Sequence, residues 1–67
     1  MKLIVKYRGK ETELEFDKEK ILAKDVLKAL NLSSEYAFVV KNGEVVSEEE
    51  EIKETDDIKV INAISGG

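Results

Sequence analysis

The sequence predicts a small α+β domain in which one helix covers one face of a mixed β-sheet. Two observations support this class: stretches in which apolar and charged residues alternate, and one segment with a helical period between them. These segments come in the order hairpin, helix, hairpin, strand. A chain of 67 residues is long enough for one domain. A single helix can bury one face of a sheet, which gives a two-layer arrangement.

The first hairpin is expected from residues 2–8 and 11–16, with Gly9-Lys10 as its tight turn. Both segments alternate, so each presents one apolar face and one charged face. The charged face of the first segment is basic and that of the second is acidic, which favours their pairing as antiparallel neighbours. The inward set is Leu3, Val5, Tyr7, Thr12, Leu14 and Phe16.

The helix is expected within residues 21–32, where apolar side chains recur every third or fourth position. Two starts agree with the pattern: a helix that Asp17 caps, or a helix that begins near Ala23. Asn31 is the expected end of the helix, because asparagine tolerates left-handed backbone angles.

A second hairpin is expected from residues 36–41 and 44–46. The first segment is rich in β-branched and aromatic residues, which favour strands. Asn42-Gly43 between the two segments is the strongest short-range hairpin signal that a sequence offers.

Residues 47–56 form a polar connection with one apolar residue, Ile52, and residues 57–61 are the last strand. We expect the first and last strands to lie side by side and parallel, with the helix in the crossover between them. The predicted core consists of Leu3, Val5, Leu14, Phe16, Leu22, Val26, Leu27, Leu30, Phe38, Val40, Ile58 and Val60.

The composition excludes several kinds of chemistry. The chain contains no Cys and no His, so disulfides, thiolate zinc sites, iron–sulfur clusters and imidazole bases are absent. We expect no catalytic side chain and no metal site. Charged residues make up 39% of the chain, against about 25% in ordinary domains, and lysine and glutamate dominate them. That bias is typical of thermophilic proteins, so we expect a thermophilic source.

Charge is distributed unevenly along the chain. Residues 1–10 carry four basic residues and no acidic one, whereas residues 44–57 carry eight acidic residues against Lys53. The net charge of −4 argues against nucleic acid as a partner and favours a basic protein surface. The run Glu48–Glu51 by itself is most simply interpreted as a solvated acidic loop. No apolar run approaches the length of a membrane span and no leader opens the chain, so we expect a cytoplasmic protein.

The sequence finishes with Ala63-Ile64-Ser65-Gly66-Gly67. Two glycines add no packing, but they maximise backbone freedom and minimise the width of the chain. Those properties suit a tail that is threaded through a narrow channel into another protein's active site. Ser65 lacks a partner base that would make it a nucleophile, so we interpret it as a flexible spacer. The simplest alternative is that the Gly-Gly ending is incidental.

The chain resembles the small β-grasp proteins that end in Gly-Gly. These are the sulfur carrier of thiamine biosynthesis, the small subunit of molybdopterin synthase and the archaeal ubiquitin-like modifiers. The resemblance covers nearly the whole chain. It rests on Val26–Leu32 in the helix, on Val39–Val46 around the second hairpin and, most specifically, on Asp57–Gly67. The ending is most similar to that of the thiamine-type carrier. One difference is Asp56-Asp57, where the family usually has Gly-Asp, which leaves the geometry of that turn open.

The resemblance implies a ubiquitin-like, ββαββ-type β-grasp domain in residues 1–63 and a flexible tail in residues 64–67. It also implies that the protein is a carrier and not an enzyme. An E1-like adenylating enzyme would use ATP and Mg²⁺ to activate the carboxylate of Gly67, with Ser65 and Gly66 threading the tail. A sulfur donor enzyme would then produce a thiocarboxylate.

Sulfur would pass to a downstream synthase or thiolation enzyme in the synthesis of thiamine, of the molybdenum cofactor or of thiolated tRNA. Two alternatives remain open: a ubiquitin-like modifier joined through Gly67 to lysines of target proteins, and a binding module that is never conjugated. We expect a free monomer that binds no cofactor of its own and no membrane. Apolar residues outside the predicted core are candidates for a docking surface; they are Ile4, Val39, Ile61 and Ile64.

Overall fold

The computed structural model describes residues 1–63. Seven strands and one helix follow one another along this part of the chain. They are β1 (Lys2–Tyr7), β2 (Lys10–Glu15), β3 (Ile21–Leu22), α1 (Ala23–Ala29), β4 (Ala37–Lys41), β5 (Glu44–Val46), β6 (Glu51–Ile52) and β7 (Ile58–Asn62).

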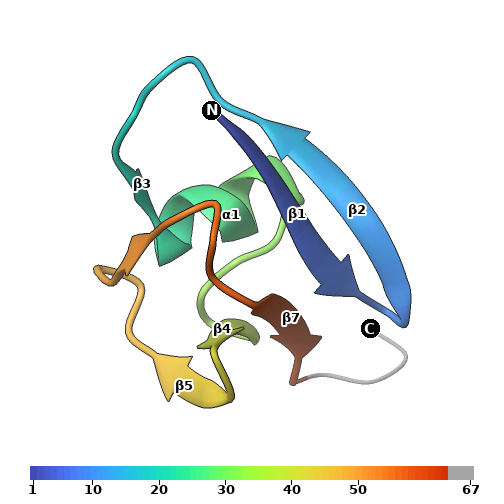
Figure 1. Ribbon diagram of the computed structural model, residues 1–67. Helices are drawn as coiled ribbons and strands as arrows, with labels where there is room; N and C mark the ends of the chain where they lie inside the picture. Colours follow the sequence, from blue (N-terminus) through green and yellow to red (C-terminus); the bar gives the residue numbers. More distant parts are fainter. Residues whose placement is uncertain (64–67) are drawn as a thin grey trace.

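Five of the strands form one mixed sheet in the order β2-β1-β7-β4-β5 (Figure 1). β1 and β7 are parallel neighbours, as predicted, and the other pairings in this sheet are antiparallel. Helix α1 covers one face of the sheet and packs against β4. This is the β-grasp arrangement, so the expected fold class is confirmed.

The first hairpin has the predicted register of opposite charges. Lys2 lies opposite Glu15 and Lys6 opposite Glu11, so the basic strand faces the acidic one. The turn consists of Arg8 and Gly9, both with positive φ, one residue earlier than expected. A two-residue turn with positive φ at both positions matches the twist of the strands that it joins.

Helix α1 is shorter than the apolar period suggests: it begins at Ala23, and its C-cap is Leu30. The start that Asp17 would cap is therefore wrong. Asn31 adopts the predicted left-handed conformation, with a φ of 60°. The N–H groups of Asn31 and Leu32 donate to carbonyls of the last helical turn, which is a Schellman motif.

Ile21 and Leu22, which continue the helical period in the sequence, belong to a separate two-stranded sheet. Strand β3 pairs there with β6, and Ile21 lies opposite Ile52. Both isoleucines are almost completely buried. The predicted core omits them because each stands beside charged residues, and the pairing that buries them joins segments about thirty residues apart.

The predicted core of β4 is on the wrong face. Ala37 and Val39 point to α1 and are buried, whereas Phe38 and Val40 lie on the opposite face and are partly exposed. The run of four apolar residues has no alternation that would set the phase, so packing against the helix decides it. Phe16, Leu22 and Leu30 are also half-buried at the edge of the core. The buried set is Leu3, Val5, Leu14, Ile21, Ala23, Val26, Leu27, Ala37, Val39, Ile52, Ile58 and Val60.

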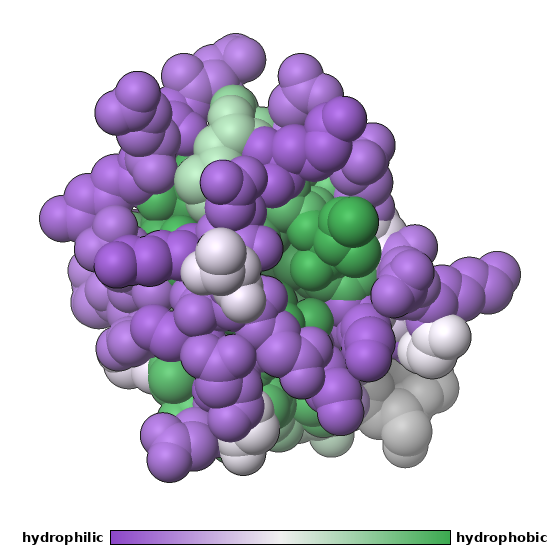
Figure 2. Space-filling view, viewed as in Figure 1, coloured by the Kyte–Doolittle hydropathy of each residue, from purple (hydrophilic) through white to green (hydrophobic). Residues whose placement is uncertain are grey.

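The surface reflects the high content of charged residues. Hydrophilic side chains cover most of the face shown in Figure 2, and hydrophobic atoms appear between them in separate areas. Across residues 1–63, no helix has the length and apolar character that crossing a membrane requires.

Candidate functional site

The point at which the predicted tail leaves the domain is anchored to the sheet. Strand β7 ends at Asn62, which lies opposite Ala37 of β4. One residue later, the N–H of Ala63 donates to the carbonyl oxygen of Tyr36 at 2.6 Å. The chain is therefore held against the start of β4 as far as Ala63. The predicted functional residues Ile64, Ser65, Gly66 and Gly67 lie outside the described residues.

An apolar surface lies on the sheet face that α1 does not cover. Phe38 is opposite Ile61, and Val40 is opposite Val45, so these four side chains are neighbours. Val45 is 67% exposed and Ile61 41% exposed. We call Phe38, Val40, Val45 and Ile61 the outer apolar patch. Its Phe38–Ile61 end is next to the point where the tail departs, because Ala37 and Asn62 form the adjacent pair.

Two of the predicted docking residues lie on this face and one does not. Ile61 is part of the outer apolar patch. Ile4 is also exposed, at 54%, but it lies on β1, and Lys6 and Lys59, which are opposite each other on β1 and β7, lie between it and the outer apolar patch. Val39 is a correction: it is 1% exposed and belongs to the core on the α1 side of β4, so it is not part of a docking patch on the outer face.

Sequence reasoning missed three residues of the patch, Phe38, Val40 and Val45. One signal was present, because the two-residue turn Asn42-Gly43 pairs Val40 with Val45 and so puts both on the same face. Nothing in the apolar run indicated which face that would be.

The turn before β7, which contains Asp56-Asp57, is held by hydrogen bonds that involve side chains. Asn42 donates from Nδ2 to Asp56 at 3.1 Å and accepts from the N–H of Asp57 at 2.9 Å. The N–H of Lys53 donates to the Asp56 carboxylate at 2.8 Å, and this bond, with that from Asn42, lowers the pKa of Asp56 below its usual value. Among residues 1–63, the non-glycine residues with positive φ are Arg8, Asn31 and Asn42, so Asp56 needs no left-handed conformation.

The acidic run is largely tied to the domain. The carbonyls of Glu50 and Glu48 accept from the N–H groups of Ala23 and Lys24, so this loop completes the start of α1. The Lys24 ammonium lies 3.4 Å from the Glu49 carboxylate.

The Glu50 carboxylate lies 2.8 Å from the ammonium of Lys41 and raises the pKa of that lysine. These contacts give Glu49 and Glu50 a structural role.

Asp25, at the third position of α1, accepts from the N–H of Leu22 at 2.8 Å and pairs with Lys18 at 3.0 Å. Burial raises the pKa of Asp25, but the bond from Leu22 and the charges of Lys18 and Lys24 outweigh it and leave the pKa below 3.8. Such a carboxylate stabilises the helix start and is a poor general acid.

Residues 1–63 contain no group of three or more acidic side chains placed to hold a metal ion. What this part of the chain offers is a binding surface and a firmly held exit for the tail.

Residues 2–67 match the family described as the ThiS family. Two solved structures have a similar fold. SAMP1 from Haloferax volcanii has a TM-score of 0.71 and 18% sequence identity, with all of both chains covered. The thiamine biosynthesis protein (ThiS) from Geobacter metallireducens has a TM-score of 0.63 and 24% identity, over 97% of this chain and 100% of the other.

Proposed function

Because the chain belongs to the ThiS family, we propose that it is a sulfur carrier whose Gly67 carboxylate is adenylated by a separate E1-like enzyme and then converted to a thiocarboxylate. The observation that carries this proposal is the family match, which extends through Ser65-Gly66-Gly67. We propose thiamine synthesis as the destination of the sulfur, with the molybdenum cofactor and tRNA thiolation as the other candidates.

The chemistry needs activation because a carboxylate is a poor electrophile. In the proposed sequence a carboxylate oxygen of Gly67 attacks the α-phosphorus of ATP and expels pyrophosphate. Hydrosulfide then attacks the acyl carbon and expels AMP, which gives the thiocarboxylate directly. A persulfide on a donor enzyme would instead form an acyl disulfide and expel AMP, and a thiol would then have to reduce the S–S bond to release the thiocarboxylate. The product, –C(O)S⁻, is a nucleophile that a downstream enzyme can use. The chain has no His and no Cys to catalyse either step, which supports the role of a cosubstrate.

Two features of the domain support docking beside the activating site. The outer apolar patch is next to the departure of the tail, so a partner that binds Phe38 and Ile61 is well placed to take up the residues that follow Ala63. The register pair Lys6 and Lys59 lies on the same face of the sheet. We therefore propose that the activating enzyme presents an apolar surface with acidic residues at its edge.

One alternative function is favoured by a specific observation. The fold similarity to SAMP1 is consistent with a ubiquitin-like modifier whose activated Gly67 acylates lysines of target proteins. The two functions share the adenylation step, and they differ in the nucleophile that attacks the adenylate.

Intact mass distinguishes these functions. Protein recovered from native cells should be about 16 Da heavier than the sequence if Gly67 carries a thiocarboxylate, because sulfur replaces oxygen. Larger species that contain this chain linked to other proteins would favour the modifier. Unmodified protein without conjugates under conditions of sulfur demand would contradict both functions.

Removal of Gly67 tests the activation step. We expect ATP–pyrophosphate exchange with the cognate activating enzyme to disappear, while the melting temperature stays close to that of the parent. Lys28→Gln, at an exposed position of α1 on the opposite face of the sheet, is the control and should keep full exchange. Normal exchange by the truncated chain would refute both the carrier and the modifier.

Gly66→Ala tests threading separately from docking. A methyl group there narrows the backbone angles that orient Gly67, and a misplacement of about 1 Å near a reacting atom can cost on the order of 100-fold in rate. We expect single-turnover adenylation to fall while the affinity for the activating enzyme persists. Weaker binding with intact chemistry would instead identify the tail as a docking anchor.

Ile61→Ser tests the outer apolar patch, and Ile4→Ser tests the predicted docking residue on β1. Both remove an exposed isoleucine from the same sheet face, so their effects on folding should be small and similar. We expect Ile61→Ser to raise the KM for the carrier several-fold. Ile4 remains a predicted docking residue, and an equal rise for Ile4→Ser would extend the interface across β1. No rise for either variant would contradict docking through this face.

A further inference from the structure

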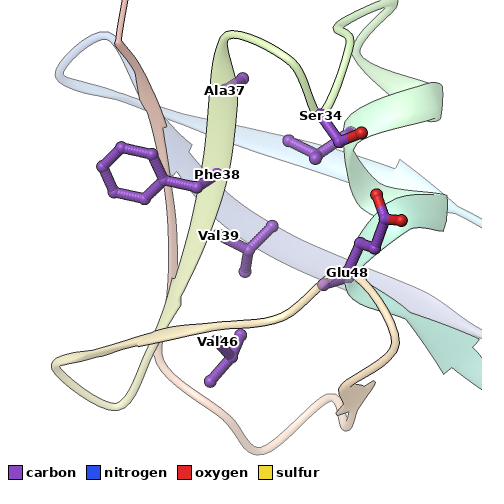
Figure 3. A pocket seen from close by; sticks show the side chains of 8 residues that line it. Ser34, Ala37, Phe38, Val39, Val46 and Glu48 are labelled. Carbon is purple, nitrogen blue, oxygen red and sulfur yellow. The ribbon is translucent and has the colours of Figure 1, made fainter.

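A small cleft opens between α1 and the β4–β5 hairpin (Figure 3). Its volume is about 200 Å³. Most of its lining residues are apolar, and two are polar, Ser34 and Glu48; the apolar ones are Ala23, Leu27, Ala37, Phe38, Val39 and Val46. Drug-sized ligands and cofactors occupy pockets of about 300–1,000 Å³, so this cleft is better matched to a single side chain.

Two polar groups lie at the mouth of the cleft. Figure 3 shows the Ser34 hydroxyl and the Glu48 carboxylate on the side next to α1, whereas the Phe38 ring points away to the outer face of the sheet. Both groups accept hydrogen bonds. The arrangement is an apolar floor with oxygen acceptors at its rim.

Glu48 differs from its neighbours in the acidic run. Glu49 and Glu50 form ion pairs with Lys24 and Lys41, whereas within residues 1–63 the Glu48 carboxylate has no hydrogen-bond or ion-pair partner. It also lies within residues 44–57, which carry eight acidic residues and one lysine. A surface of this charge attracts a cation, and Glu48 is free to pair with it.

We propose that this cleft binds a lysine side chain presented by a partner protein. The methylenes of the lysine lie over the apolar floor, as such stems commonly do on apolar surfaces, and the ammonium donates to Glu48 and Ser34. The unpaired carboxylate of Glu48 favours a cationic group, and the apolar residues below it favour an aliphatic stem. The proposal is independent of the proposed function, because its test measures binding of a lysine derivative to this chain in the absence of an activating enzyme.

The experiment is an NMR titration of the full chain with Nα-acetyl-lysine methylamide. We expect saturable shift changes at Ala23, Ala37, Val39 and Val46, with a dissociation constant on the order of 1–10 mM for so small a probe. Nα-acetyl-norleucine methylamide has a similar stem without the charge and should produce much smaller changes. The lysine-induced changes should also weaken as salt is added.

Comparison of Glu48→Gln with Glu11→Gln separates the effect of the carboxylate at the cleft from the effect of the net charge of the chain. Both remove one negative charge from an exposed position. Glu48→Gln should weaken binding about threefold to tenfold, and Glu11→Gln should leave it unchanged. Equal weakening by both variants, equal shifts with the norleucine probe, or shifts spread over the acidic segment would overturn the proposal. Cleft shifts that depend on protein concentration alone would place a second copy there and would also overturn it.

Discussion

Replacement of Val39 or Val40 by alanine tests which face of β4 is buried. The two residues are adjacent on β4, and their side chains point to opposite faces of the sheet. Val39 is 1% exposed and lies between Val46 and Val60 on the helix side. Val40 lies on the outer face, opposite Val45. Both changes remove the same atoms and the same β-propensity, so the difference between them isolates burial.

The magnitude follows from the size of the group removed. Valine to alanine deletes two methyl-sized groups, worth about 0.8 kcal/mol each when buried. The space left beneath α1 adds to this loss, so Val39→Ala should lower the free energy of unfolding by about 2–3 kcal/mol. Val40 is half-exposed, and its replacement should cost about 0.5–1 kcal/mol.

Urea denaturation at neutral pH measures both values. With a slope near 1 kcal/mol per M for a small protein, the two midpoints should differ by about 1–2.5 M. The melting temperatures should differ by roughly 4–20 °C, at about 4–8 °C per kcal/mol. A larger loss for Val40→Ala would mean that β4 is turned over and that Val40 faces the helix, and equal midpoints would contradict the difference in burial.

Three further predictions concern the helix and the turn before β7. Leu27→Ala, on the buried face of α1, should lower the free energy of unfolding by about 2–5 kcal/mol in urea denaturation, and a midpoint equal to that of the parent would contradict the helix orientation. Asp25→Ala should cost about 1–2 kcal/mol at pH 7, because it removes the bond to the Leu22 N–H. Folding lowers the pKa of Asp25, so this stabilisation is fully present above 3.8 and is lost as the pH falls through the folded-state value. Parent and variant midpoints should therefore converge as the pH falls below 3.8, and a gap that does not narrow would contradict an electrostatic contribution of the Asp25 carboxylate. Asn42→Ala should lower the free energy of unfolding by about 1.5–3 kcal/mol in urea denaturation. The change removes a residue suited to positive φ and its hydrogen bonds with Asp56 and Asp57. A loss below about 0.5 kcal/mol would show that these bonds contribute little.

Most of the fold follows from local signals in the sequence. Apolar and polar residues alternate along β1 and β2 with Ile4 as the exception, so a one-residue slip of the register would turn the apolar set to the solvent. Asn42 and Asn31 adopt the left-handed conformations that their positions predict, because asparagine tolerates them better than most residues. The parallel pairing of β1 with β7 follows from topology, since one helix has to cover the sheet.

The candidate site was predicted less completely. Ile61 was identified because it is an apolar residue outside the expected core, and its exposure agrees with that assignment. Val39 was assigned to the surface because β4 is apolar throughout. The partners Phe38 and Val45 become part of the same patch through the pairing of β4 with β7 and β5.

The sequence by itself determined the order of the two hairpins, the helix and the last strand, the Asn42-Gly43 turn, the charge of each face of the first hairpin and the residues of the tail, because each depends on neighbours along the chain. Tertiary structure decided three other features. It set the inward face of β4, it shortened α1 by drawing Ile21 into a pair with Ile52, and it left Glu48 unpaired at a cleft while Glu49 and Glu50 found lysines. The physical reason is common to all three: each depends on a contact between segments distant in sequence, and four consecutive glutamates or four consecutive apolar residues carry no period that would distinguish one member from the next.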